Sequence, residues 1–235
     1  MPTPALFKEV DGMETNCVIH GDCLEVMKNI PDKSIDVSFT SPPYNRKRND
    51  KYEYYDDTIK DYYSFLKSTI NELLRITKRN IFFNIQKNFY NKKEVYKIIG
   101  EYSEEIYDII IWEKNNPTPS PSHSITNSYE FILCFGKELK SNSTYSKNHI
   151  KTNKSKMIKE HKAIMHLDVA KYIIMNFTKK HELVLDCFGG SGTTAVACIN
   201  LDRKYILIEQ EKKYIDIIHR RIELANIERV QQLFK

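Results

Sequence analysis

Residues 182–209 read ELVLDCFGGSGTTAVACINLDRKYILIE, and this stretch decides the fold. Residues 182–186 predict a buried strand, residues 187–194 a glycine-rich turn, and residues 195–201 a helix. A second strand is predicted over residues 204–209, and it ends in the carboxylate of Glu209. This order of elements is the nucleotide-binding βαβ layout: a strand, a glycine turn, a helix, and a second strand that ends in an acid about 20 residues after the turn. We therefore predict an α/β fold with a mostly parallel sheet.

The residues of the turn argue against a phosphate-bearing ligand. Asp186 stands at the strand tip beside the glycines, where its negative charge would meet a pyrophosphate. The turn also lacks the Gly-Lys-Ser/Thr ending of a P-loop, so nucleoside triphosphate hydrolysis is not expected. An adenosyl ligand without phosphates, carrying an ammonium and a sulfonium, would instead be attracted to that carboxylate.

A second informative stretch, residues 40–45 (TSPPYN), follows a predicted strand at residues 35–39. Two successive prolines fix φ and remove two backbone donors, and the residue before each proline is held extended. The result is a stiff segment with the Ser41 hydroxyl, free carbonyl acceptors and the ring of Tyr44. Such a segment suits a flat heterocycle with an exocyclic amino group. An ordinary proline turn that ends a strand is the alternative interpretation.

Together the two stretches resemble amino-group DNA methyltransferases, which use S-adenosylmethionine. Ser41-Pro42-Pro43-Tyr44 resembles their catalytic motif IV, and residues 186–194 resemble their cofactor motif I. The catalytic motif comes first, as in the circularly permuted beta class, and the resemblance runs from about residue 20 to about residue 222. It implies a single Rossmann-like methyltransferase domain over residues 1–235, with catalytic roles for Ser41, Pro42, Pro43 and Tyr44.

The resemblance also implies a set of cofactor-binding residues. Asp22 matches the acid that reads the cofactor adenine, Glu209 the acid that binds the ribose, and His161 lies in a segment similar to motif X. The remaining cofactor candidates belong to motifs IV and I: Thr40, Asp186, Phe188, Gly190, Gly192 and Thr193. The chain departs from the family pattern at Cys187, Lys162 and His166, where prolines are usual.

The first residue of motif IV favours one target base. Serine there is typical of cytosine-N4 enzymes and aspartate of adenine-N6 enzymes, so we expect N4-methylation of a flipped-out cytosine, with adenine-N6 methylation as the alternative. Carbon-5 methylation requires a Pro-Cys pair, and no cysteine here follows a proline. Enzymes that methylate RNA or protein glutamine normally carry the reverse motif order. The intact glycines and Glu209 argue against a non-catalytic DNA-binding regulator.

Positive charge is concentrated in two segments. Residues 137–160 hold seven lysines against two glutamates, and this segment reads as a loop or insert. Residues 45–62 form the loop after motif IV. We expect both segments to contact DNA phosphates, through Arg46, Lys47, Arg48, Lys147, Lys151, Lys154 and Lys156. A solvated loop is the alternative interpretation of the lysine-rich segment.

Length and composition restrict the remaining options. A chain of 235 residues with 41% hydrophobic content can bury one core. We find no apolar run long enough to span a bilayer and no secretory signal. The five cysteines include no C-x-x-C pair, so we expect reduced thiols and a cytoplasmic protein. The histidines are scattered along the sequence, so we expect no metal site. The resemblance to DNA methyltransferases implies double-stranded DNA as the partner, and through it an association with the nucleoid. Residues 137–160 are too short for a recognition domain, so loops, a second subunit in a homodimer, or both must supply sequence specificity.

The rest of the chain alternates predicted helices and strands. Apolar spacing predicts helices over residues 61–77, 92–99, 169–177 and 214–224, and strands over residues 80–85, 107–112 and 128–135.

Overall fold

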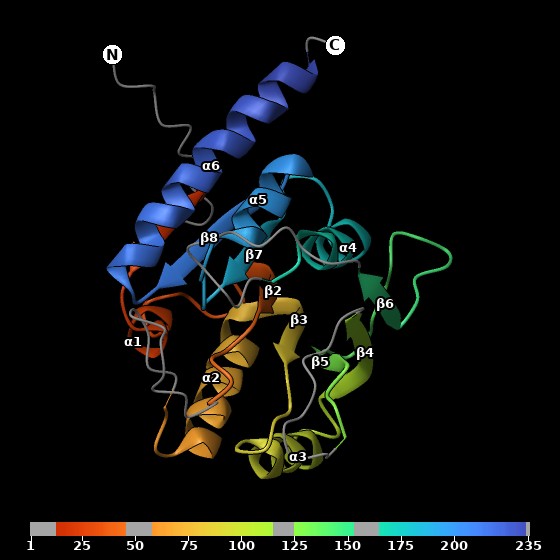
Figure 1. Ribbon diagram of the computed structural model, residues 1–235. Helices are drawn as coiled ribbons and strands as arrows, with labels where there is room; N and C mark the ends of the chain where they lie inside the picture. Colours follow the sequence, from red (N-terminus) through yellow and green to blue (C-terminus); the bar gives the residue numbers. More distant parts are fainter. Residues whose placement is uncertain (1–12, 46–57, 115–124, 153–164, 234–235) are drawn as a thin grey trace.

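A computed structural model describes residues 13–45, 58–114, 125–152 and 165–233 (Figure 1). Its centre is an eight-stranded sheet in the order β1-β8-β7-β2-β3-β5-β4-β6. The strands are β1 (Cys17–His20), β2 (Ile35–Thr40), β3 (Thr77–Ile85), β4 (Ile106–Lys114), β5 (Tyr129–Phe135), β6 (His149–Thr152), β7 (Leu183–Asp186) and β8 (Lys204–Glu209).

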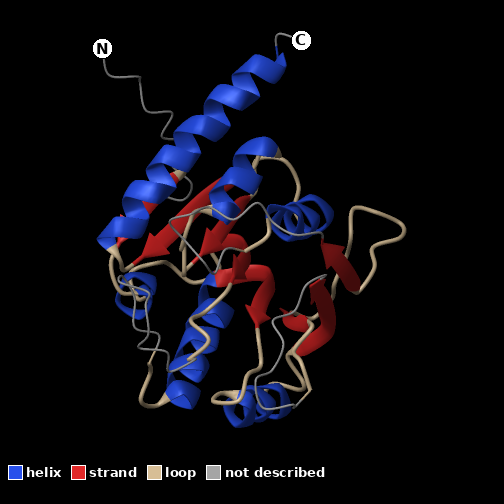
Figure 2. Ribbon diagram, in the orientation of Figure 1, coloured by secondary structure: helices blue, strands red, loops and turns tan. Residues whose placement is uncertain are grey.

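Helices cover both faces of the sheet (Figure 2). One face carries α1 (Cys23–Met27), α2 (Tyr62–Ile76) and α3 (Lys92–Glu101), and the other carries α4 (Leu167–Phe177), α5 (Thr193–Asn200) and α6 (Lys212–Leu233). Each face has its own buried apolar cluster, because successive strand residues point to opposite sides. In β3, for example, Ile81 and Phe83 face α1–α3, whereas Phe82 faces α4–α6. The result is a three-layer α/β domain.

The strand pairings are mostly parallel, as predicted. β1, β8, β7, β2 and β3 pair in parallel, β5 lies antiparallel between β3 and β4, and β6 pairs in parallel with β4. β2 and β7 are direct neighbours, with Val37 opposite Val184 and Ser38 opposite Leu185. The carboxyl ends of parallel strands meet at one edge of the sheet. Motif IV and the glycine turn therefore lie side by side, although they are far apart in the sequence.

Three short elements differ from the sequence-based expectation. β1 and α1 were not predicted, and β6 lies inside residues 137–160, which we expected to be a loop or insert. Each of the three has only four or five residues, too few to show a clear period in the sequence. No helix in the described part of the chain is both long and apolar enough to cross a membrane.

Candidate active site

The glycine loop, residues 187–192, connects β7 to α5 with a tightly constrained backbone. Gly190 and Gly192 have φ of 52° and 79°, in the left-handed region that glycine adopts without strain. Gly192 is the residue from which α5 begins. A Cβ on Gly189 would lie 3.3 Å from the carbonyl oxygen of Ile208, so the loop packs closely against β8. These contacts explain why the sequence needs glycine here.

Glu209 fastens the glycine loop to the end of β8. Its Oε2 accepts a hydrogen bond of 2.7 Å from the backbone N–H of Gly190, and its Oε1 accepts one of 2.8 Å from Glu211. Burial raises the pKa of this carboxyl, whose residue is only 9% exposed. Each carboxylate oxygen can accept a second hydrogen bond. Glu209 can therefore hold the loop and still bind a ligand hydroxyl.

Asp186 connects the glycine loop to motif IV. Its Oδ1 accepts hydrogen bonds from the Thr40 hydroxyl at 2.8 Å and from the Phe188 N–H at 3.1 Å. Its Oδ2 accepts one of 2.6 Å from the Thr194 hydroxyl. Burial is the main reason that the pKa of this carboxyl is raised to about 6. One buried acid thus joins two segments that the sequence analysis singled out separately.

Asp22 lies next to Glu209 at the same edge of the sheet. His20 is opposite Glu209 in the β1–β8 pairing, and the N–H of Gly21 donates to the Glu209 carbonyl at 3.1 Å. The Asp22 side chain caps α1 by accepting hydrogen bonds from the backbone N–H groups of Leu24 and Glu25. Asp22 is exposed, so its carboxylate is also open to a ligand.

The carbonyls of motif IV are less free than the sequence suggested, which corrects our expectation. The Tyr62 hydroxyl donates to the Pro43 carbonyl at 2.6 Å. The Asn88 and Asn91 side-chain amides donate to the Tyr44 carbonyl at 2.7 and 2.8 Å. These donors come from α2 and from the segment between β3 and α3, so the sequence around motif IV could not reveal them. The Pro42 carbonyl remains the candidate acceptor for a ligand.

A polar cluster behind motif IV was not predicted. The Ser41 Oγ lies 2.8 Å from the Tyr44 hydroxyl, which donates to Glu130 Oε2 at 2.8 Å. Asn84 Nδ2 lies 2.7 Å from both the Tyr44 hydroxyl and Glu130 Oε2, and Lys114 forms an ion pair with Glu130. The signal in the sequence was a polar residue within an apolar run: Asn84 interrupts the apolar residues 81–85 of β3, and Glu130 lies among the apolar residues of β5.

The last cofactor candidates, Phe188 and Thr193, also lie at the glycine loop. The Phe188 ring packs against the α1–α3 apolar cluster, 5.8 Å from the Phe65 ring centroid. Thr193 is buried at the start of α5. Arg221 of α6 was not predicted, and it donates to the Ser191 carbonyl at 2.5 Å. This guanidinium stabilises the loop, and nothing in the sequence near the loop indicates its presence.

The structure describes only part of the predicted DNA-binding set. Lys147 and Lys151 are both exposed, near and in β6 at the sheet edge, and Lys151 pairs with Glu113 at 2.7 Å. An exposed ion pair of this kind contributes little to stability, so Lys151 remains available to a phosphate. Six predicted residues lie outside the described part of the chain: Arg46, Lys47, Arg48, Lys154, Lys156 and His161.

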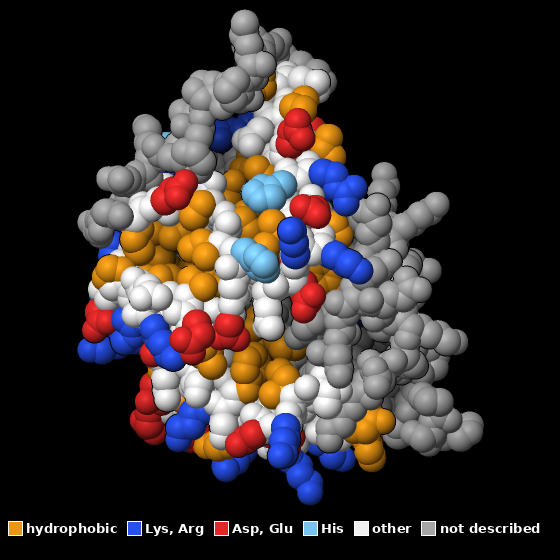
Figure 3. Space-filling model, turned by 90° about the vertical axis from the view of Figure 1, so that its left-hand side faces the viewer, with side chains coloured by type: hydrophobic (Ala, Val, Ile, Leu, Met, Phe, Trp, Pro, Cys, Tyr) orange, Lys and Arg blue, Asp and Glu red, His pale blue; other side chains and the backbone are white. Residues whose placement is uncertain are grey.

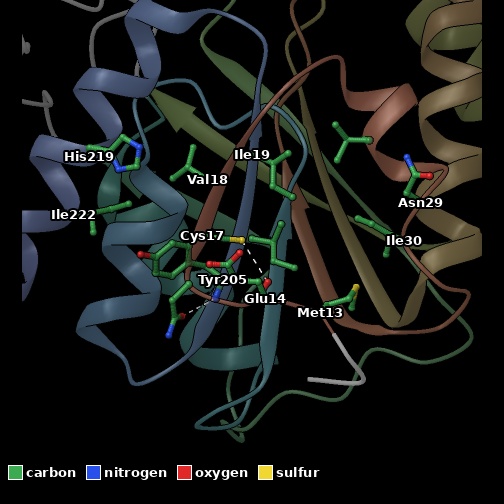
Figure 4. Close-up of a pocket in the computed structure, with 13 residues that line it drawn as sticks. Met13, Glu14, Cys17, Val18, Ile19, Asn29, Ile30, Tyr205, His219 and Ile222 are labelled. Atoms are coloured by element: carbon green, nitrogen blue, oxygen red, sulfur yellow. Dashed lines mark hydrogen bonds between the residues drawn. The ribbon is translucent and has the colours of Figure 1, made fainter. Parts of the chain in front are cut away.

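A groove of about 520 Å³ runs along the outer strand of the sheet, away from these residues. Val18 and Ile19 of β1 form its floor between Ile222 of α6 and Ile30, which follows α1 (Figure 4). Hydrophobic side chains gather on this face of the molecule (Figure 3). None of the predicted site residues lines the groove, so it is not the candidate active site.

Comparison with known proteins agrees with this geometry. The family model for N6/N4-type DNA methylases matches residues 35–220 of the chain. The chain belongs to this family. The DNA methylase is 30% identical to the type II methyltransferase M2.MboI of Moraxella bovis, with 87% of this chain and 86% of that protein covered. It is 28% identical to M.HinfI of Haemophilus influenzae, with 88% and 68% covered.

Solved structures show the same fold as this DNA methylase. The cytosine-N4-specific PvuII DNA methyltransferase superposes with a TM-score of 0.72 at 20% identity, covering 87% of this chain and 85% of that one. The complex of M1.HpyAVI with SAM superposes with a TM-score of 0.63 at 26% identity, covering 87% and 98%.

Proposed function

We propose that this DNA methylase transfers a methyl group from S-adenosylmethionine to the exocyclic N4 of a cytosine flipped out of double-stranded DNA. The observation that carries the proposal is the hydrogen bond of 2.8 Å from Thr40 to Asp186. It joins the Ser-Pro-Pro-Tyr segment to the glycine loop at neighbouring strand ends. A methyl acceptor held by one segment and a donor held by the other would therefore meet in a fixed arrangement.

The chemistry of the acidic residues fits S-adenosylmethionine. Glu209 and Asp186 end the adjacent strands β8 and β7, and Asp22 follows β1, the neighbour of β8. Together they form an acidic edge beside the glycine loop. Such an edge repels phosphates and attracts a ligand with net positive charge. Glu209 would accept from the ribose hydroxyls and Asp22 from the adenine amino group, while the glycine backbone allows close approach. When bound, S-adenosylmethionine supplies a methyl group activated by a sulfonium.

Motif IV would hold the target base and tune its amino group. The Ser41 hydroxyl and the Pro42 carbonyl accept hydrogen bonds from the two amino N–H groups, and the Tyr44 ring stacks on the base. These contacts favour a lone pair that is localised on nitrogen instead of delocalised into the ring. The nitrogen becomes acidic once it is methylated, so its proton leaves without a strong base. Placement and electrostatics therefore provide most of the rate enhancement.

The basic segments would hold the duplex while the base is extruded. A base stacked in a duplex cannot reach the methyl donor, so the target nucleotide must rotate into the site. Arg46, Lys47 and Arg48 come soon after motif IV in the sequence, separated from it only by Asn45, where an extruded base would enter. Lys147, Lys151, Lys154 and Lys156 would contact phosphates farther along the DNA.

The cysteine beside motif IV argues against carbon-5 methylation. Cys187 Sγ lies 3.5 Å from the Thr40 hydroxyl, so it is close enough to be considered as a nucleophile. Burial raises the pKa of this thiol well above its usual value. A thiol that remains protonated is a poor nucleophile. Transfer to an amino group is therefore the reaction that the site supports.

Methyl transfer from radiolabelled S-adenosylmethionine tests this function. Purified protein is incubated with unmethylated duplex DNA, total RNA or a protein extract, and each fraction is counted. We expect label in duplex DNA alone, and its loss with Ser41→Ala at an unchanged melting temperature. Label in RNA or protein but not in DNA would refute the proposed substrate.

A further inference from the structure

A buried carboxylate lies behind the candidate catalytic serine. Glu130 is 2% exposed at the start of β5 and has hydrogen-bonding partners at both oxygens. Oε2 accepts from the Tyr44 hydroxyl at 2.8 Å and from Asn84 Nδ2 at 2.7 Å, while Oε1 pairs with Lys114. A carboxylate buried with this many partners is costly to desolvate, so its position calls for a specific role.

The charge of Glu130 sets the direction of every proton in the cluster. An ionised carboxylate can only accept hydrogen bonds, so the single proton of the Tyr44 hydroxyl must point to Glu130. The Tyr44 oxygen is then only an acceptor for its other neighbours. The Ser41 Oγ is 2.8 Å from that oxygen, so Ser41 must donate its own proton to Tyr44. The Ser41 Oγ accepts a long hydrogen bond of 3.3 Å from Asn84 Nδ2 and keeps its other lone pair for a ligand.

Asn84 fixes the same direction from the other side. Its amide nitrogen lies 2.7 Å from both Glu130 Oε2 and the Tyr44 hydroxyl. A flipped amide would place its oxygen against the carboxylate, so the nitrogen must face Glu130. This orientation leaves Asn84 Oδ1 buried without a partner among the described residues. The protein tolerates one unpaired amide oxygen because this orientation directs both N–H groups of Asn84 into the polar cluster.

We propose that Glu130 is a positioning residue that, through Tyr44, forces the Ser41 hydroxyl to act as a hydrogen-bond acceptor toward the target amino group. This inference rests on the proposed amino-methylation. Serine is neutral and can donate or accept, so without a fixed partner it would bind an amino group ambiguously. An aspartate in the place of Ser41 would supply a negative charge directly. Here Glu130 supplies that charge through two hydrogen bonds, from Tyr44 to Glu130 and from Ser41 to Tyr44.

Glu130→Gln tests the inference with almost no change of shape. Lys114 requires an acceptor, so the glutamine oxygen turns to Lys114 and its NH₂ group faces Tyr44 and Asn84. Asn84 must then turn its Oδ1 toward this NH₂ group, because two amide nitrogens cannot face each other. Tyr44 accepts from Gln, and the Tyr44 proton, no longer held by a carboxylate, becomes available to Ser41. We expect the single-turnover methylation rate to fall about 10- to 100-fold, with the KM for S-adenosylmethionine and for DNA unchanged.

Glu101→Gln is the matched control, because Glu101 also bonds a tyrosine hydroxyl and a lysine. Its partners are Tyr63 and Lys67 on the surface of α2, away from the cluster. This variant should methylate at the rate of the unmodified protein. A similar loss of rate in both variants would show that Glu130 has only a structural effect.

Tyr44→Phe provides the second measurement, since it removes the hydroxyl and keeps the stacking ring. If Glu130 acts through Tyr44, Glu130→Gln will lower the rate no further in a Tyr44→Phe background. Rate losses that multiply in the double variant would refute the inference, as would a normal rate for Glu130→Gln. A wild-type protein that methylates no DNA would refute the proposed function instead, so the two failures are distinguishable.

Discussion

Asp186→Asn should make the folded protein more stable at pH 8 but weaken its binding of S-adenosylmethionine, and both effects should shrink as the pH falls. Burial raises the pKa of Asp186 from its usual 3.8 to about 6 in the folded protein. Because the folded protein binds this proton more tightly than the unfolded chain does, protonation of Asp186 stabilises the fold. This contribution has its full value below the pKa of the unfolded chain, and it is lost as the pH rises through about 6. A difference of about two pH units corresponds to about 3 kcal/mol at most.

The folded protein should therefore gain stability from the substitution at high pH. An asparagine oxygen can accept from Thr40 and Phe188, and its NH₂ group can donate to the Thr194 hydroxyl, so the hydrogen bonds are retained. We expect the variant to be more stable than wild type at pH 8, and this advantage to shrink as the pH falls to 5. Urea unfolding at four pH values measures the difference.

Cofactor binding should show the reverse trend. A cationic ligand favours the ionised carboxylate, so affinity for S-adenosylmethionine in wild type should fall as the pH drops through about 6. Removal of a charge-assisted hydrogen bond of about 1.5–3 kcal/mol weakens binding about 10- to 150-fold at pH 8. Calorimetric titration of the variant should show little of the wild-type pH dependence.

Asp36→Asn is the control for this experiment. Asp36 lies in β2 and accepts a hydrogen bond from Leu183 at the opposite end of the same strand pair. Its substitution should leave cofactor affinity unchanged. The reasoning fails if Asp186→Asn binds S-adenosylmethionine with the affinity and pH dependence of wild type.

Three further variants probe the remaining parts of the site. Glu209→Ala should reduce S-adenosylmethionine affinity by about 1.5–3 kcal/mol in calorimetry while circular dichroism stays native; unchanged affinity would remove Glu209 from the cofactor site. Ser41→Ala should lower turnover far more than cofactor affinity, whereas an equal loss of both would indicate a general disturbance. Neutralising the four lysines 147, 151, 154 and 156 should weaken the salt dependence of DNA binding. The slope of log affinity against log salt should fall by about one for each phosphate contact that is lost. An unaltered slope would show that this segment is a solvated loop that does not contact DNA.

Much of the sheet could be predicted because its main elements carry strong local signals. The strand and glycine turn that precede Glu209 have a spacing that few other folds use, and the structure places β7, α5 and β8 there. The amphipathic pattern of residues 61–77 likewise predicted α2 to within a residue at each end. β6 was missed because its four residues pair with a distant strand and show little pattern of their own.

The hydrogen-bond partners of the site could not be predicted, because the fold brings them from distant segments. Glu130 lies 86 residues beyond Tyr44, and only the antiparallel pairing of β5 with β3 places it behind motif IV. Asn91 reaches the Tyr44 carbonyl across 47 residues. Residue types and spacing suggested the chemistry that we propose for motif IV, and tertiary packing determined which of its polar atoms already have hydrogen-bond partners within the protein.

Identification of the methylated base tests the central claim most directly. Duplex DNA treated with the protein and S-adenosylmethionine carrying a deuterated methyl group is digested to nucleosides, and the products are identified by mass spectrometry against standards. Our account predicts labelled N4-methyldeoxycytidine. Labelled N6-methyldeoxyadenosine without any modified cytosine would contradict the base assignment, and labelled 5-methyldeoxycytidine would contradict transfer to an amino group.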